Sequence, residues 1–389
     1  MIFDNTLGQS CRNEVLRNPL ADAAAPYGTA QAAILNDAAF DEARATISGW
    51  EGYAPTSLWP LNATAKDAGV AAIHYKDEST RFGLGSFKAL GGAYAVDRLL
   101  KREGRPAAEI TVCCATDGNH GRSVAWGART FGAACVIFIH AGVSEARKAA
   151  IEAYGATVIR TPGNYDDSVR IAQEQAAGNG WFVVSDTSYP GYTEVPKDVM
   201  QGYEVMAAEA LDALTEPPTH IFLQTGVGGM AAAVAAFAKR RFGADRPQIV
   251  LADPANSACW VESLRAGEPR AIHGDLDTLM AGLACGEVSL LAWEILRETA
   301  DAVVSVEDAD ATALMRALAR PENGGIVAGE SAVAGLAAAL ATVAHDPARA
   351  ALGLTKDSRI LVFGTEGDTD AALYQEIVGQ SGAQVIAAR

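Results

Sequence analysis

The chain has 389 residues, of which 49% are hydrophobic and 20% are charged. This balance excludes a disordered chain, and the length fits two domains or one large α/β unit. The 31 basic and 47 acidic residues give a formal net charge of −16. That charge argues against nucleic acid as a partner, because phosphate backbones bind clustered Lys and Arg.

The spacing of the cysteines and the distribution of hydrophobic residues indicate the cellular compartment of the protein. The six cysteines contain no CxxC spacing, so neither a disulfide framework nor a metal site is predicted. Charges interrupt the apolar stretches and the first residues lack an export signal, so no membrane partner is expected. These patterns predict a cytoplasmic protein. The sequence leaves open whether Cys259 and Cys285 form a disulfide, although a reducing cytosol favours thiols.

Strand-like and helix-like runs alternate along the chain, which is typical of an α/β fold with parallel-rich sheets flanked by helices. We expect two domains, a small one at 88–195 and a large cofactor domain formed by 1–87 and 196–389. The small domain and the segment before it are predicted to hold strands at 73–79, 109–117, 134–142, 157–163 and 181–187, and helices at 87–104, 121–132, 144–156 and 166–180. The remainder is predicted to hold a strand and glycine turn at 219–229, a helix at 230–243, and strands at 248–254, 302–308 and 358–370.

Polar and glycine-rich clusters stand where these strands end, which is where α/β sheets bind ligands. The glycine turn at 226–229 follows a strand and opens a helix, so its backbone N–H groups and the helix dipole favour a phosphate. A tight packing turn is the alternative. The turn lacks the lysine of a P-loop and the spacing of a GxGxxG fingerprint, so a nicotinamide dehydrogenase is disfavoured.

Lys88 stands in an apolar stretch at the start of a predicted helix. It either extends to solvent or stays inside as a reactive amine. Together with a phosphate-binding turn, it suggests an aldehyde cofactor held as a Schiff base.

Two further strand ends carry carboxylates. Asp117 opens the turn that continues through Asn119 and His120, where helix capping and a packed histidine are the structural alternatives. Asp186 follows a buried strand and serves either as a turn residue or as a site acid.

The ordered segments PTSLW, KDESTRFGLGSFKALGGAYA, ATDGNHGRSVAWGA, SDTSYPGY, TGVGGM and GTEGDTD resemble the pyridoxal-phosphate enzymes of the tryptophan-synthase-β fold type, fold type II. Within that group the chain is most similar to the diaminopropionate ammonia-lyases. The resemblance runs from Pro55 to Asp370. It implies pyridoxal 5′-phosphate as the cofactor, an amino acid as the substrate, and a homodimer.

The resemblance also implies roles for individual residues. Lys88 would carry the cofactor, Asn119 would contact its O3′ oxygen, and Thr365 would face the pyridine nitrogen, where Glu366 is the alternative. Asp117 and Asp186 match acids found in the lyases and would act in catalysis and substrate binding. The phosphate would lie against Gly226, Val227, Gly228, Gly229 and Met230, and the substrate carboxylate against Thr116, Asp117, Gly118, Asn119 and His120.

The implied reaction is an α,β-elimination of 2,3-diaminopropionate to pyruvate and two ammonia by a carbon–nitrogen lyase. A closed site with acidic side chains favours the extra amine over the hydroxyl of serine. Lys88 or Asp186 is expected to act as the base for the L-isomer, and Asp117 for the D-isomer. The alternatives are a serine/threonine dehydratase or hydroxy-amino-acid lyase of the same fold, and a pyridoxal-phosphate-binding protein without turnover.

Overall fold

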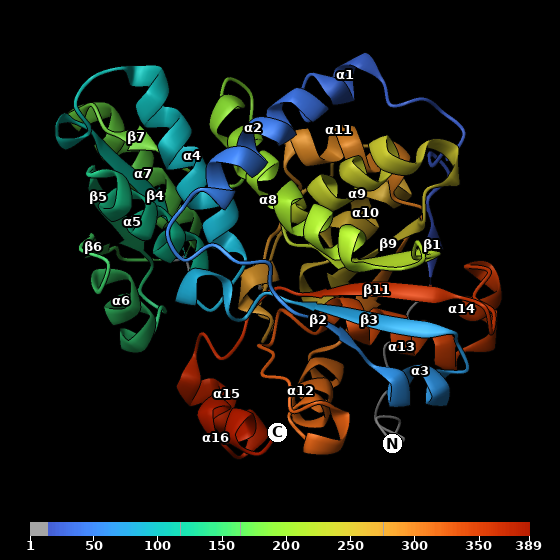
Figure 1. Ribbon diagram of the computed structural model, residues 1–389. Coiled ribbons are helices and arrows are strands. Elements are labelled where there is room, and N and C mark those ends of the chain that lie inside the picture. The colour runs from blue at the N-terminus through green and yellow to red at the C-terminus, as the bar shows by residue number, and fades with distance from the viewer. Residues whose placement is uncertain (1–14, 117, 164, 275) are drawn as a thin grey trace.

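The computed structural model describes residues 15–389 except 117, 164 and 275. It contains two sheets that lie side by side (Figure 1). The larger sheet has seven strands in the order β1-β10-β9-β8-β11-β3-β2. Its five central strands are parallel, whereas β1 and β2 pair antiparallel at the two edges. These strands are β1 (Leu16–Arg17), β2 (Leu58–Pro60), β3 (Ala72–Asp77), β8 (His220–Gln224), β9 (Gln248–Pro254), β10 (Ala302–Val306) and β11 (Arg359–Gly364).

The smaller sheet has four parallel strands in the order β6-β5-β4-β7. All of its strands fall within the segment expected to form the small domain, although the boundaries at 88 and 195 stay a prediction. The strands are β4 (Thr111–Ala115), β5 (Ala134–Ile139), β6 (Thr157–Arg160) and β7 (Phe182–Val183).

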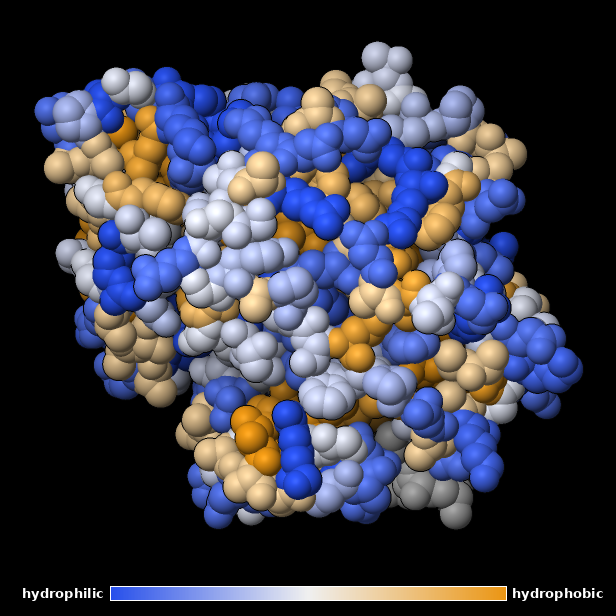
Figure 2. All heavy atoms as spheres, in the orientation of Figure 1, coloured by the Kyte–Doolittle hydropathy of each residue, from blue (hydrophilic) through white to orange (hydrophobic). Residues whose placement is uncertain are grey.

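Helices cover both sheets, and Figure 1 shows α8 to α11 on one face of the larger sheet and α13 on the other. None of the helices in the described part of the chain is long and apolar enough to cross a membrane. The surface in Figure 2 is mostly hydrophilic, with hydrophobic residues in small scattered patches. The helices are α1 (Thr29–Ala32), α2 (Asp37–Ser48), α3 (Asn62–Ala68), α4 (Lys88–Glu103), α5 (Asn119–Phe131), α6 (Glu145–Glu152), α7 (Tyr165–Asn179), α8 (Glu194–Ala213), α9 (Gly229–Phe242), α10 (Cys259–Ala266), α11 (Leu290–Thr299), α12 (Asp308–Leu318), α13 (Ala334–Ala344), α14 (Asp346–Ala351), α15 (Ala371–Val378) and α16 (Gly382–Ala387).

The expected α/β fold is confirmed, and most predicted strands and helices appear within a few residues of their places. The strand expected at 181–187 is reduced to Phe182–Val183, because the chain then turns toward the cavity described below. The strand expected at 358–370 ends at Gly364, and residues that follow it line the same cavity. The long helix α8 was not predicted; most of its side chains are buried.

Close packing of α4 against α8 sets the position of Lys88, the first residue of α4. A Cβ atom placed on Gly202 of α8 would lie 2.0 Å from the carbonyl oxygen of Leu90. Only glycine therefore permits this approach of the two backbones. The consequence is that α4 begins directly beside the buried face of α8.

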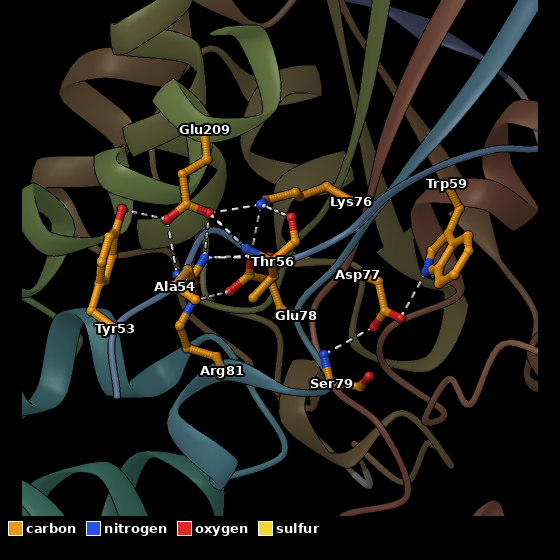
Figure 3. Close-up of polar contacts among 10 residues, drawn as sticks. All are labelled: Tyr53, Ala54, Thr56, Trp59, Lys76, Asp77, Glu78, Ser79, Arg81 and Glu209. Carbon is orange, nitrogen blue, oxygen red and sulfur yellow. Dashed lines mark hydrogen bonds and ion pairs between the residues drawn. The ribbon is translucent and has the colours of Figure 1, made fainter. Parts of the chain in front are cut away.

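A buried cluster of charges holds the segment that connects β3 to α4 (Figure 3). Glu209 of α8 accepts hydrogen bonds from Lys76 Nζ at 2.7 Å and from Arg81 Nη2 at 2.6 Å. Glu78 accepts one from Arg81 Nε at 2.8 Å, and Tyr53 donates its hydroxyl to Glu209. The two cations and two carboxylates balance, which is the condition for burying charge.

Removing one carboxylate from this cluster should destabilise the protein strongly. We expect Glu209→Gln to lower the free energy of unfolding by about 3–5 kcal/mol, because Lys76 and Arg81 would keep only Glu78 as a counter-ion. Burial alone would raise the pKa of Glu209, but the bonds and charges of Arg81 and Lys76 lower it. The stabilisation is therefore present at neutral pH and is lost as the pH falls through the acidic range.

Urea unfolding at neutral and acidic pH would measure both effects. The matched control is Glu262→Gln, because the side chains of Glu262 and its partner Arg265 are 47% and 48% exposed and such pairs contribute little. Equal stabilities of the two variants at neutral pH would contradict the role given to the cluster.

Candidate active site

One cavity lies at the carboxyl ends of strands from both sheets, at the place expected for an α/β ligand site. The walls come from the segments after β4, β7, β8 and β11 and from the first turns of α4, α5 and α9. Asp117 lies outside the described residues. Every other residue predicted for the site lines this cavity: Lys88, Thr116, Gly118, Asn119, His120, Asp186, Gly226, Val227, Gly228, Gly229, Met230 and Thr365.

Lys88 and Asp186 form an ion pair inside the cavity, with 2.6 Å between Nζ and Oδ2. Burial disfavours the charged form of each group, but the opposite charge of the partner outweighs it. As a result, the pKa of Lys88 lies above its ordinary range and the pKa of Asp186 lies below. The shared proton therefore rests on the lysine.

His120 faces this ion pair from the first turn of α5. Its Nε2 lies 2.8 Å from the carbonyl oxygen of Val184, and this contact assigns the proton to Nε2. Its Nδ1 lies 3.9 Å from Asp186 Oδ2 and is buried without a hydrogen bond among the described residues. Burial lowers the pKa of His120, so its ring is neutral. The unprotonated Nδ1 therefore faces the Lys88–Asp186 ion pair.

The turn before α5 brings its backbone N–H groups together. Thr116 Oγ1 accepts hydrogen bonds from the N–H groups of Gly118 and Gly121, at 3.1 and 3.3 Å. Asn119 then opens the helix and donates its side-chain amide to Glu366. Thr116 thus satisfies two N–H groups at the start of α5, and the contact of this turn with the substrate carboxylate stays a prediction.

The glycine turn between β8 and α9 also presents N–H groups to the cavity. The carbonyl oxygen of Gly226 accepts from Trp260 Nε1 at 2.9 Å, and that of Val227 accepts from the N–H of Ser289 at 2.9 Å. Since the C=O and N–H of a trans peptide point in opposite directions, the N–H groups of Val227 and Gly228 point away from these donors. The turn therefore fits a phosphate, the group it was predicted to bind.

The wall formed by Thr365 and Glu366 is tied to the segment that carries Lys88. The N–H of Phe87 donates to the carbonyl oxygen of Thr365 at 3.0 Å, and Ser86 and Glu366 form an isolated β-bridge. The hydroxyl of Thr365 accepts from Gln224 Nε2 at 2.9 Å. Both Thr365 and Glu366 line the cavity, so the choice between them for the pyridine nitrogen stays open.

The sequence indicated Glu366 at the cavity but not Glu330, and the structure places both acids in its lining. Burial and the neighbouring charge of Glu366 raise the pKa of Glu330 to about 8. Arg147 of α6 contacts Glu330 at 3.3 Å and Asp370 at 3.3 Å, so it joins the smaller sheet's unit to the larger one. The only available signal was that Glu330 interrupts a long apolar run.

Cys285 lines the cavity and Cys259 is buried close to it. Both cysteines are thiols, and the described residues contain no disulfide.

Comparisons with known proteins agree with this site. A family model described as pyridoxal-phosphate dependent enzyme matches residues 50–365. The diaminopropionate ammonia-lyase of Escherichia coli K12 is 41% identical over 350 residues, which cover 84% of this chain and 88% of that protein. The protein of the same name from Salmonella typhimurium is 35% identical over 386 residues, which cover 90% and 95%.

Solved structures agree as well. A crystal structure of the Escherichia coli diaminopropionate ammonia-lyase in complex with D-serine superposes with a TM-score of 0.86 and 36% identity, covering 94% of this chain and 96% of that one. Another, with an aminoacrylate-PLP azomethine reaction intermediate, has a TM-score of 0.84 and 38% identity over the same shares. The chain therefore belongs to the family of pyridoxal-phosphate dependent enzymes, alongside the diaminopropionate ammonia-lyases.

Proposed function

We propose that this chain is a carbon–nitrogen lyase that converts 2,3-diaminopropionate and water to pyruvate and two ammonia, with pyridoxal 5′-phosphate as its cofactor. The observation that carries the proposal is the Lys88–Asp186 ion pair in one cavity with the glycine turn. A reactive amine and a phosphate site in one cavity are what this cofactor requires. Relatives that cover most of the chain bear the name of this activity.

The residues of the cavity suit each part of the cofactor. Lys88 Nζ is the amine that would hold it covalently, and the N–H groups at 227–229 would bind its phosphate. Bound in this way, pyridoxal phosphate supplies an electron sink that stabilises the negative charge left on Cα when its proton is removed. Asn119 and Thr365 are the proposed polar contacts for the rest of the ring, because both line the same cavity.

Proton transfer is assigned to Lys88 and Asp186. A lysine takes a proton from carbon only as a neutral amine, whereas Asp186 holds Lys88 as an ammonium. Lys88 must therefore pass its proton on before it can act as a base. Asp186 Oδ2 lies 2.6 Å from Nζ and can receive that proton. The unprotonated Nδ1 of His120 lies 3.9 Å from the same oxygen and is the proposed next acceptor of that proton.

The acidic lining of the cavity supports a diamine as the substrate. Asp186 and Glu366 both line it. Carboxylates near the β-nitrogen would keep that nitrogen protonated, so that it leaves Cβ as neutral ammonia. The hydroxyl of serine or threonine gains nothing comparable from them, which separates this proposal from a dehydratase.

A substrate panel would test the function directly. We expect the cofactor-loaded chain to release pyruvate from 2,3-diaminopropionate with kcat/KM at least about 100-fold above that for serine. Lys88→Ala should release none. A serine preference would support the dehydratase, and cofactor binding without pyruvate from any amino acid would support a binding protein without turnover.

The two enantiomers should separate the roles of the acids. With Asp117→Asn we expect kcat to fall by about 10²- to 10⁴-fold on the D-isomer and little on the L-isomer, because its base would be lost on one face only. Asp186→Asn should show the reverse preference. Steady-state pyruvate release from each isomer measures this, and equal losses on both isomers would reject the division.

We also infer a cytoplasmic homodimer. The six cysteines, whose spacing indicates no disulfide framework, support a reducing compartment, and the dimer rests on the family resemblance. Sedimentation equilibrium should give twice the mass of the chain. A mass that stays at one chain over a range of concentrations would contradict the dimer.

A further inference from the structure

Trp260 lies beneath the glycine turn, on the side away from the cavity. Its indole is fully buried, and its Nε1–H donates to the carbonyl oxygen of Gly226 at 2.9 Å. A Cβ atom on Gly228 would lie 2.2 Å from the Cζ2 atom of Trp260, and the φ of Gly228 is 96°. The indole thus contacts the turn through a hydrogen bond at one residue and through close packing at another.

The hydrogen bond determines where one peptide plane points. Gly226 C=O and Val227 N–H belong to the same peptide, and the described residues contain no cis peptide bond. Because the carbonyl points toward Trp260, the N–H points into the cavity. The next peptide has the same orientation, because the carbonyl oxygen of Val227 accepts a hydrogen bond from the backbone N–H of Ser289.

Hydrogen bonds to Asp253 fix the position of Trp260 itself. Asp253, at the end of β9, accepts hydrogen bonds from the N–H groups of Trp260 and Val261 at 2.9 and 3.2 Å. Its other oxygen accepts from Thr225 Oγ1 at 3.1 Å. Since Thr225 immediately precedes the turn, one carboxyl group fixes both the indole and the strand end that the indole contacts.

We propose that Trp260 is a positioning residue for the cofactor phosphate, acting through the carbonyl of Gly226 to aim the N–H of Val227 into the cavity. The inference rests on the proposed function, because it takes the glycine turn as the phosphate site. Trp260 itself touches neither substrate nor cofactor in this assignment. It orients a donor on a peptide that follows a glycine, where the backbone has few steric restrictions of its own.

The test uses two forms of the cofactor, pyridoxal phosphate and pyridoxal, which differ only in the phosphate. Trp260→Phe keeps an aromatic ring beneath Gly228 but removes the donor. We expect the dissociation constant of the variant for pyridoxal phosphate to rise about tenfold, as for loss of one hydrogen bond that serves a charged group. Its affinity for pyridoxal should stay unchanged, and the ³¹P signal of the bound cofactor should shift.

Trp293→Phe is the matched control, because its ring lies 6.1 Å from that of Trp260 in the same core. This substitution should alter neither affinity. Equal weakening of both cofactor forms by Trp260→Phe, or no weakening, would overturn the inference. If the unsubstituted chain shows no preference for the phosphorylated form, the phosphate site of the proposed function fails instead.

A measurement on the unsubstituted protein covers the case in which Trp260→Phe does not fold. The indole proton of Trp260 should exchange with deuterium more slowly with pyridoxal phosphate bound than with pyridoxal bound. A phosphate bound to the N–H of Val227 would restrict the motion of the whole peptide. That peptide includes the carbonyl oxygen of Gly226, to which the indole N–H donates. Equal exchange rates in the two complexes would contradict the role of Trp260.

Discussion

The pairing of buried charge is the constraint on which the site depends. Lys88 must stand inside the protein, and the end of β3 and the connection that follows it carry the charged residues Lys76, Glu78 and Arg81. All three are almost fully buried, and Glu209 of α8 completes their pairing. An unpaired charge at this depth would cost several kcal/mol or more. The connection is therefore restricted to the arrangement in which these charges are paired.

The same connection includes a strained residue. Phe82 has a φ of 50°, the one positive value among the described residues other than glycine. Its ring packs against Trp126 with 5.0 Å between centroids, and Arg81 beside it is held by two carboxylates. Strain of this kind persists only where the surroundings fix the backbone. It lies six residues before Lys88, at the point where the chain turns from the larger sheet into α4.

The cavity combines two opposite electrostatic requirements. The glycine turn presents N–H groups that favour an anion, whereas Asp186 and Glu366 favour cations. In the proposed function, the second amine of the substrate supplies a cation and the cofactor phosphate supplies an anion. Backbone dipoles, rather than lysine or arginine, would then bind phosphate in this acidic protein.

Local patterns were sufficient for much of the fold. The alternation of apolar strands with helices ending at glycines such as Gly104 and Gly132 predicted the parallel strands and most helices of the smaller unit. The edge strands β1 and β2 were not predicted, because two or three residues carry too little pattern. The helix α8 was not predicted either, and its burial on most sides is visible only in the tertiary structure.

The sequence by itself determined which residues could do chemistry: Lys88 at a helix start, the N–H groups of the glycine turn, and acids at strand ends. These are properties of residue type and local backbone, so they can be recognised without knowledge of the fold. Only the tertiary structure decided that Asp186 pairs with Lys88, that Glu330 and Glu366 share the cavity, and that Trp260 supports the glycine turn. Such contacts join residues that are far apart in the chain, so they depend on how the two sheets pack and leave no periodic signal in the sequence.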